Sequence, residues 1–199
     1  MMKMTKVKLL IIGHELLQGK TIDTNTQFVA QTLYTNHFSL EEVIILGDNK
    51  ERLAQEISSF WHPDSSFDLL ILTGGLGITK DDLTKEAMSM ALGREQQYSA
   101  ESAKAAKQSY ERIGRDFDIK AKEHPYCRVP EGMKVFQNKG GLAPCPYLQE
   151  KNKMIMSFPG VPRELELTFL QEALPEIQSF FAEGGQKIQQ DQLIFKTRY

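Results

Sequence analysis

The sequence contains little cysteine. Among its 199 residues are two cysteines, Cys127 and Cys145, and neither has a second pair or a nearby histidine at metal-ligand spacing. Disulfide-rich scaffolds and structural zinc sites need such residues at short, regular intervals. We therefore expect neither a disulfide framework nor a zinc site, and the cytoplasm is the expected compartment.

An excess of one charge and long apolar runs are also missing. Lysine and arginine number 24, and aspartate and glutamate 26, so the charge balance gives no case for binding nucleic acid or an anionic membrane. The first apolar run ends at Ile12 with no small-residue cleavage pattern after it, and no stretch approaches the roughly 20 apolar residues of a membrane span. We expect neither nucleic acid nor a membrane as a partner.

What the chain does contain is an alternation of strand and helix patterns, which is typical of an α/β layer fold. The predicted strands cover 7–12, 43–46 and 69–72, and the predicted helices cover 24–34, 48–61, 80–93 and 99–113. The segment 124–146 is crowded with proline and glycine and predicts loops and short strands.

The last third predicts a hairpin over 147–158 and then a helix from Pro162 with a broad apolar stripe before Pro175, in a region that Gly184 and Gly185 break. We assign residues 1–183 to one domain and residues 184–199 to a linker and a strand, 192–195, that leads out of it. The chain is then expected to be the leading portion of a longer protein.

The most informative stretch is Thr73 to Thr84, which follows an apolar strand with a glycine-rich turn. Glycine permits positive φ and lets backbone N–H groups approach a ligand. Thr79 stands three residues before Asp82, which is capping-box spacing, so a helix is predicted to begin near Lys80. The pattern is neither a Walker A loop nor the dinucleotide fingerprint.

Two adjacent carboxylates at this predicted helix start favour a cation. The helix dipole would attract a phosphate, but Asp81 and Asp82 would repel it. Mg²⁺ resolves the conflict, because one or two carboxylates plus phosphate oxygens typically hold it. The alternative is structural: both aspartates also suit a first helical turn without any ligand, and the glycines suit any tight turn.

Ligands of open α/β sheets collect beyond the carboxyl ends of the strands. Four polar or glycine-rich segments stand at such ends, and we expect them to form one pocket; they are 13–19, 47–49, 73–82 and 159–162. Glu15, Asp48, Asp81 and Asp82 would then lie near one another and hold the metal. Asp48 has an alternative role as the cap of the following helix.

The same segments carry a family resemblance. Residues 13–25 resemble the opening motif of the CinA (competence/damage-inducible protein A) family, and residues 73–84 resemble its central motif. Further motifs at 47–49, 129–132, 138–144 and 159–164 follow in order over nearly the whole chain. The resemblance implies the molybdopterin-binding domain of MogA-like and gephyrin-like proteins, a three-layer α/β/α sandwich with a mostly parallel mixed sheet.

This resemblance implies chemistry at a phosphoanhydride. CinA-type domains are associated with metal-dependent hydrolysis of ADP-ribose to AMP and ribose 5-phosphate. The molybdopterin branch instead binds a pterin phosphate and, in some members, adenylylates it. A third alternative is a nucleotide-binding module that has lost catalysis. The small-molecule partner is thus a nucleotide or a pterin phosphate, and relatives are usually dimers or trimers.

The resemblance also implies the site residues. Asp48 and Asp82 match the family's key aspartates, and our mechanistic hypothesis has them, with Glu15 and Asp81, hold Mg²⁺ against the diphosphate while Lys80 offsets developing charge. The expected substrate-binding residues are Gly13, Glu15, Asn25, Thr73, Gly74, Gly75, Gly77, Thr79, Thr84, Asn138, Gly140, Gly141, Pro159 and Gly160.

The chain departs from the family pattern in several loops that should shape the nucleotide pocket. His14 and Leu142 stand where threonine is usual, and Ile78 stands where proline is usual. Cys145 and Pro146 replace an expected glycine and aromatic residue. Because the carboxylates are retained, the resemblance supports metal binding more firmly than it supports one substrate.

Overall fold

The structure is a computed structural model that describes residues 4–183. Six strands form one sheet in the order β2-β1-β3-β8-β7-β6. Their bounds are β1 Lys6–Ile12, β2 Ser39–Leu46, β3 Leu69–Thr73, β6 Lys134–Phe136, β7 Cys145–Glu150 and β8 Lys153–Phe158. The linker and strand predicted for residues 184–199 lie outside the described residues.

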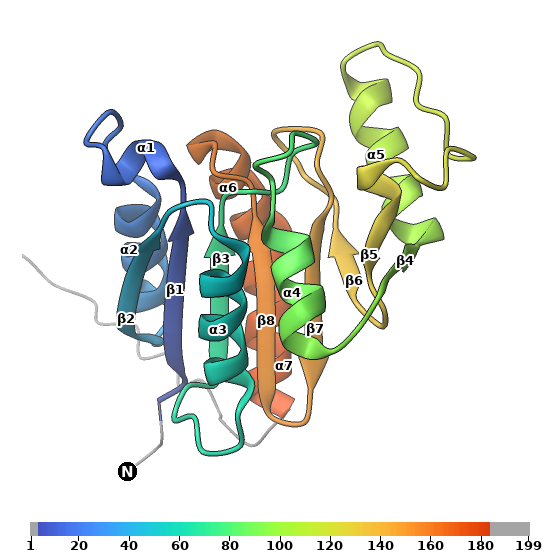
Figure 1. Cartoon of the computed structure of the whole chain (residues 1–199). Coiled ribbons are helices and arrows are strands. Elements are labelled where there is room, and N and C mark those ends of the chain that lie inside the picture. The colour runs from blue at the N-terminus through green and yellow to red at the C-terminus, as the bar shows by residue number, and fades with distance from the viewer. Residues whose placement is uncertain (1–3, 184–199) are drawn as a thin grey trace, which may run out of the picture.

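The sheet is mixed but mostly parallel, as the sequence predicts. Strands β2, β1, β3 and β8 are parallel neighbours, and β7 runs antiparallel between β8 and β6. The predicted hairpin is the β7–β8 pair, which turns at Lys151 and Asn152. All four parallel neighbours therefore present their carboxyl ends at the same edge of the sheet, at the top of Figure 1.

Helices cover both faces of the sheet, so the molecule has three layers (Figure 1). Their bounds are α1 His14–Leu17, α2 Asn25–Thr35, α3 Lys50–Trp61, α4 Thr84–Leu92, α5 Ala100–Arg112, α6 Pro162–Thr168 and α7 Leu174–Glu183. Side chains of β1 alternate between the two faces: Leu9 and Ile11 pack with α2, α6 and α7, whereas Leu10 and Ile12 pack with α3 and α4. The predicted α/β/α sandwich is confirmed.

A small addition lies beyond the β6 edge of the main sheet. Strands β4 (Gln96–Tyr98) and β5 (Arg128–Pro130) pair antiparallel, and α5 rises beside them (Figure 1). The helix α5 begins at its Ser99 cap, whose hydroxyl accepts a hydrogen bond from Ser102 N at 3.1 Å. Strand β4 is missing from the sequence-based prediction because three residues carry too little pattern to register.

The helix predicted from Pro162 continues past Pro175. A π-helical turn over Phe169–Ala173 joins α6 to α7, and the helix continues to Glu183. Proline lacks the N–H that an α-helix requires, and a π-turn is a known way to insert such an irregularity. The buried side chains of Phe169, Ala173 and Ile177 keep the continuous helix on the sheet.

A buried ion pair ties the sheet to α3. Lys8 is 5% exposed, and its Nζ lies 2.7 Å from Glu56 Oε2 and 2.8 Å from Glu42 Oε2. Arg52 Nη2 lies 2.5 Å from the other oxygen of Glu56. Burial alone would lower the pKa of Lys8, but hydrogen bonds from the ammonium to Glu42 and Glu56 raise it above its usual value. The ammonium is therefore held charged by two carboxylates.

We predict that Glu56→Ala lowers the free energy of unfolding by about 2–3 kcal/mol, because it leaves a buried ammonium with one partially exposed partner. Urea unfolding followed by circular dichroism measures the change. Gln55→Ala, on the exposed side of the same helix, is the matched control and should stay within about 0.5 kcal/mol of the parent. Equal effects of the two substitutions would contradict the role given to the ion pair.

Candidate functional site

The loops that follow β1, β3 and β8 meet at Gly74. Gly74 N donates to Phe158 O at 2.9 Å, which joins the ends of β3 and β8. A Cβ at Gly74 would lie 2.0 Å from Ile12 O, at the end of β1, and Gly74 has a φ of +107°. Gly160 approaches from the other side, since its own Cβ would lie 3.5 Å from Gly74 Cα. Only glycine fits here, so this contact fixes how the three loops lie together.

The loop after Gly74 is closed by the carboxylate of Asp82. Its Oδ1 accepts from Gly77 N at 2.8 Å, and its Oδ2 accepts from Thr79 N at 2.8 Å and Thr79 Oγ1 at 2.6 Å. The helix α4 begins at Thr84, so the predicted helix start near Lys80 is wrong. The spacing of Thr79 and Asp82 closes a loop instead of capping a helix, because the carboxylate binds N–H groups that precede it.

Thr84 stabilises the same loop from its buried side. Its Oγ1 donates to Gly74 O at 2.7 Å and its N donates to Gly75 O at 3.2 Å, and the residue is fully buried. A Cβ at Gly75 would lie 2.5 Å from that hydroxyl. The hydroxyl of Thr84, predicted to bind substrate, is therefore used to hold the loop that runs from Gly74 to Asp82.

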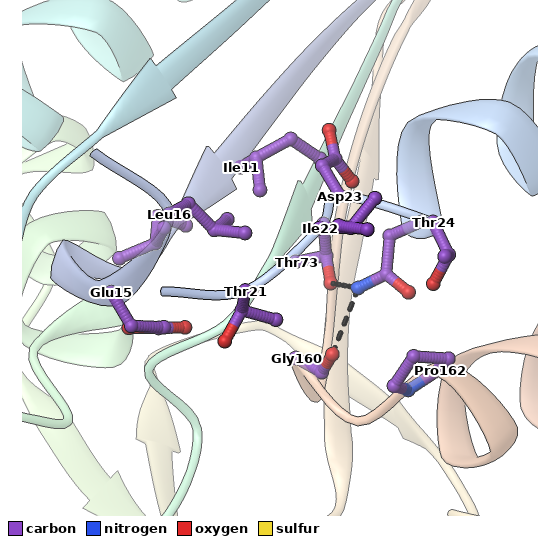
Figure 2. Close-up of a pocket in the computed structure, with 12 residues that line it drawn as sticks. Ile11, Glu15, Leu16, Thr21, Ile22, Asp23, Thr24, Thr73, Gly160 and Pro162 are labelled. Atoms are coloured by element: carbon purple, nitrogen blue, oxygen red, sulfur yellow. Dashed lines mark hydrogen bonds between the residues drawn. The ribbon is translucent and has the colours of Figure 1, made fainter. Parts of the chain in front are cut away.

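One pocket, the Asn25 pocket, lies at the start of this loop and has a volume of about 60 Å³. Figure 2 shows the side chains that surround it, contributed by the end of β1, the segment from α1 to α2, Thr73, and the turn before α6. They are Ile11, Ile12, Glu15, Leu16, Thr21, Ile22, Asp23, Thr24, Asn25, Thr73, Gly160 and Pro162. Four expected substrate-binding residues thus meet here: Glu15, Asn25, Thr73 and Gly160.

Hydrogen bonds fix the floor of the Asn25 pocket (Figure 2). Asn25 Nδ2 donates to Thr73 Oγ1 at 3.0 Å and to Gly160 O at 2.9 Å. Thr73 Oγ1 in turn donates to Pro159 O at 2.9 Å. The start of α2 is held by Asp23, whose carboxylate accepts from Thr26 N at 3.0 Å.

A second pocket, the Lys85 pocket, lies at the other end of the loop and has a volume of about 170 Å³. It is bounded by the loop itself, the first turn of α4, β4 and the segment before β5. Its residues are Gly77, Ile78, Thr79, Asp82, Lys85, Glu86, Gln96, Glu123, Pro125 and Arg128. Gly77, Thr79 and Asp82 are the expected site residues that it contains.

Lys85 is a residue that sequence reasoning missed. It is 7% exposed, and its ammonium donates to Pro125 O and, at 3.3 Å, to Arg128 O. Burial lowers the pKa of Lys85 to about 8, although the Asp82 carboxylate works in the opposite direction. Burial and the nearby Lys85 also lower the pKa of His124. The sequence does offer one signal for Lys85: it stands three residues before Met88, so the two side chains share the buried side of α4.

The expected single cluster of four carboxylates is not found. Glu15 lines the Asn25 pocket and Asp82 the Lys85 pocket, whereas Asp48, Asp81 and Lys80 are exposed and line neither. Within residues 4–183, no three side chains of histidine, cysteine, aspartate or glutamate gather closely enough to hold a metal ion. The Asp82 carboxylate is turned back onto its own loop by hydrogen bonds from Gly77 N and Thr79 N, and the Glu15 carboxylate lies beside Gly13.

Asp48 and Asp82 nevertheless precede neighbouring helices at the same edge of the sheet. Asp48 is not the cap of α3, since that role belongs to Asn49, whose Oδ1 accepts from Arg52 N at 2.8 Å. The first turns of α3 and α4 meet where Lys50 Nζ lies 3.8 Å from Glu86 Oε2. The capping alternative for Asp48 is thereby removed.

The oxygen donors present fit magnesium rather than a softer metal. Mg²⁺ usually keeps several waters and uses one or two carboxylates plus ligand phosphate oxygens. Asp82 is held in place by its three donors, and Asp48 is exposed just before α3, the helix that neighbours α4. These two carboxylates would hold the ion only together with a phosphate-bearing ligand.

The predicted glycine segment after β6 is engaged within the protein. Asn138 is fully buried; its Oδ1 accepts from Gly140 N at 3.0 Å and Gly141 N at 2.7 Å, and its Nδ2 donates to Glu164 Oε2 at 2.7 Å. A Cβ at Gly140 would lie 2.8 Å from Glu164 Cα. Asn138, Gly140 and Gly141 therefore hold a turn against α6, and they line neither pocket.

Gly13, another expected substrate-binding residue, joins the end of β1 to β2, because its N–H donates to Leu46 O at 3.0 Å.

No described helix is long and apolar enough to cross a membrane.

Comparison with known proteins shows which proteins this chain resembles. Residues 8–179 match the model of a family described as "probable molybdopterin binding domain". A putative competence-damage inducible protein of Natranaerobius thermophilus is 32% identical over 181 residues, which are 90% of this chain and 43% of that protein. One of Clostridium acetobutylicum is 33% identical over 175 residues, 88% of this chain and 41% of that protein. The chain thus spans about two fifths of these relatives.

Solved structures show the same fold. A CinA protein of unknown function from Thermoplasma acidophilum has a TM-score of 0.72 and 22% identity, covering 87% of this chain and 98% of that one. A tungsten cofactor synthesizing protein MoaB from Pyrococcus furiosus has a TM-score of 0.55 and 16% identity, covering 92% and 98%. At these identities the likeness concerns the fold.

Gly74→Ala should destabilise the protein far more than an ordinary glycine substitution. The new Cβ would meet the Ile12 carbonyl, whereas a Cβ at Gly114, which also has positive φ, would meet nothing within 4 Å. We expect Gly114→Ala to cost about 1–2 kcal/mol of unfolding free energy and Gly74→Ala to cost several kcal/mol or prevent folding. Chemical denaturation of both variants makes the comparison. Similar losses in the two would refute the close contact at Gly74.

Lys85 should make stability depend on pH. Its pKa of about 8 in the folded protein lies below the usual 10.5, so between these values the unfolded chain binds more protons and stability rises with pH. The free energy of unfolding of the parent, relative to Lys85→Met, should rise by about 2 kcal/mol from pH 8 to pH 10. Urea titrations at several pH values measure it. A difference that does not change with pH would show that Lys85 titrates normally.

Proposed function

This chain belongs to the probable molybdopterin binding domain family, with competence-damage inducible proteins among its relatives, and from that premise we propose that it hydrolyses a nucleotide diphosphate. The proposed substrate is ADP-ribose and the products are AMP and ribose 5-phosphate. The resemblance to CinA suggests this reaction, and the geometry of the site supports it.

One observation carries the proposal: a single glycine loop connects two pockets. The loop begins at Thr73, which lines the Asn25 pocket, and reaches the Lys85 pocket at Gly77. ADP-ribose has two sugar-containing halves joined by a diphosphate. A ligand of this form could place one half in each pocket and its diphosphate along the outer side of the loop between them.

The two key aspartates take different roles in this proposal. Asp82 already accepts three hydrogen bonds from the loop, so its charge is fixed in place beside the diphosphate. Asp48 is exposed at the start of α3 and is the better group to take a proton from the attacking water. When bound, Mg²⁺ supplies Lewis acidity to the diphosphate. Lys80, exposed in the loop, offsets the charge that develops on the departing phosphate.

Glu15 is less suited to the metal than to the ligand. It lines the Asn25 pocket, at the end of the loop opposite to Asp82. Asp81 is exposed and lies outside both pockets, and we assign it a weaker, long-range contribution to the field at the cation. Asp48, Asp82 and the diphosphate would therefore hold the proposed Mg²⁺.

Molybdopterin binding is the second candidate, favoured by the description of the family itself. A pterin phosphate also has a polar ring and an anionic end, which the two pockets could accept. An enzyme of this kind would transfer AMP from ATP to molybdopterin and release little AMP from ADP-ribose. Both candidates place an anhydride or phosphate along the Gly74–Asp82 loop.

We expect purified protein with ADP-ribose and Mg²⁺ to release AMP, detected by ion-exchange chromatography. Asp48→Asn and Asp82→Asn should each lower the rate about 100-fold or more, because each removes a charge that stabilises the transition state by several kcal/mol. Asp64→Asn, in the exposed segment before β3, removes the same charge at the opposite end of β3 from the loop and should stay within about twofold.

Circular dichroism must show that Asp82→Asn is folded, since Asp82 also closes the loop. No AMP above the level of Asp82→Asn would defeat the hydrolase proposal. ATP-dependent adenylylation of molybdopterin, measured in parallel, would then favour the second candidate, and its absence together with nucleotide binding would indicate a module without catalysis.

A further inference from the structure

Asn25 carries a buried polar atom that the described protein leaves without a partner. The residue is 7% exposed, and no described donor reaches its Oδ1. Such an orphaned acceptor is costly, because a buried carbonyl oxygen normally receives a hydrogen bond. Asn25 is one of the residues that line the Asn25 pocket, so a small adjustment of the amide would let a group in that pocket supply the missing donor.

The orientation of the Asn25 amide is fixed by its neighbours. Gly160 O can only accept, so the atom 2.9 Å from it must be the nitrogen. Thr73 Oγ1 gives its own proton to Pro159 O and therefore accepts from the same nitrogen. Exchanging the nitrogen and oxygen of Asn25 would break both contacts. The orphaned atom is thus an acceptor, and it requires a donor.

The charged side chains of the Asn25 pocket are both carboxylates, and the hydroxyls of Thr21 and Thr24 lie beside them. Glu15 contributes a carboxylate, and no lysine or arginine is among the described residues that line the pocket. Asp23 is already engaged by Thr26 N and, at 2.5 Å, by Thr26 Oγ1. A phosphate would meet like charge here and find no basic partner. The pocket instead suits a neutral group that carries donors.

Size and shape fit a sugar hydroxyl edge. A volume of about 60 Å³ holds about four to six water-sized groups, which is enough for the hydroxyl edge of one sugar ring. Ile12, Leu16 and Pro162 supply apolar walls for the C–H face of a sugar ring. A carboxylate that accepts from ribose hydroxyls is a known device of nucleotide-binding sites.

We propose that the Asn25 pocket binds the hydroxyl edge of a ribose in the substrate, with Asn25 Oδ1 and the Glu15 carboxylate as the acceptors. This inference rests on the proposed function, which supplies a ribose-containing substrate. It makes both residues determinants of specificity for ribose over deoxyribose, because a missing hydroxyl leaves the buried Asn25 Oδ1 unpaired and removes a hydrogen bond to the exposed Glu15 carboxylate.

Binding of the reaction products tests this without turnover. Calorimetry on the intact chain would compare AMP with 2′-deoxy-AMP, and ribose 5-phosphate with 2-deoxyribose 5-phosphate. We expect at least one ribose compound to bind about 10- to 100-fold more tightly than its deoxy partner, as expected for an unpaired buried polar group. Equal affinities within both pairs, or no binding of any of the four compounds, would overturn the proposal.

Two variants test whether Asn25 and Glu15 cause the preference for ribose. Asn25→Ala removes the acceptor but also its contacts with Thr73 and Gly160, so Glu15→Gln, which keeps the size of an exposed side chain, is the second variant. The preference for ribose should fall to about threefold or less in both. Glu101→Gln, exposed on α5, is the charge-matched control and should keep the preference of the parent.

A preference that persists unchanged in Glu15→Gln and in folded Asn25→Ala would place the hydroxyl contacts elsewhere and overturn the assignment. The outcome is separate from that of the AMP-release assay. Ribose preference without hydrolysis of ADP-ribose would defeat the hydrolase proposal and leave this pocket as a ribose site. Hydrolysis without a preference for ribose would support the hydrolase proposal and overturn the assignment of the Asn25 pocket as a ribose site.

Discussion

The close packing of Gly74 on the ends of β1 and β8 is the constraint on which the candidate site depends. With Ile12 O, Phe158 O and Gly160 around it, the backbone at this point has no room for a side chain. The loop that follows is then shaped by the Asp82 carboxylate and the Thr84 hydroxyl, which bind its backbone from two sides. A rigid turn of this kind can keep two pockets at a fixed separation.

Most of the fold is predictable from the sequence because its signals are local. The apolar run at 69–72 is a strand buried on both faces, and the hairpin over β7 and β8 is marked by its turn at Lys151 and Asn152. One failure is also informative. The Asp82 carboxylate accepts hydrogen bonds from N–H groups that precede it in the loop, so α4 starts later than capping-box spacing predicts.

The candidate site is predictable only in part. Motif spacing places Glu15, Asn25, Thr73 and Gly160 around one pocket, although they come from three separate segments. It does not reveal that a second pocket exists, because Lys85 acquires its environment from Pro125 and Arg128, about 40 residues away in the chain. Nor can spacing show which way the Asn25 amide points, since that follows from hydrogen bonds to Thr73 and Gly160.

The central claim is that one ligand spans both pockets along the Gly74–Asp82 loop. A crystal structure of the protein with ADP-ribose, prepared without a divalent metal to prevent turnover, tests it most directly. The account predicts a sugar edge against Asn25 and Glu15, a diphosphate beside the loop and the remaining half of the ligand near Lys85. Density for ADP-ribose confined to another surface, with both pockets holding only water, would contradict it.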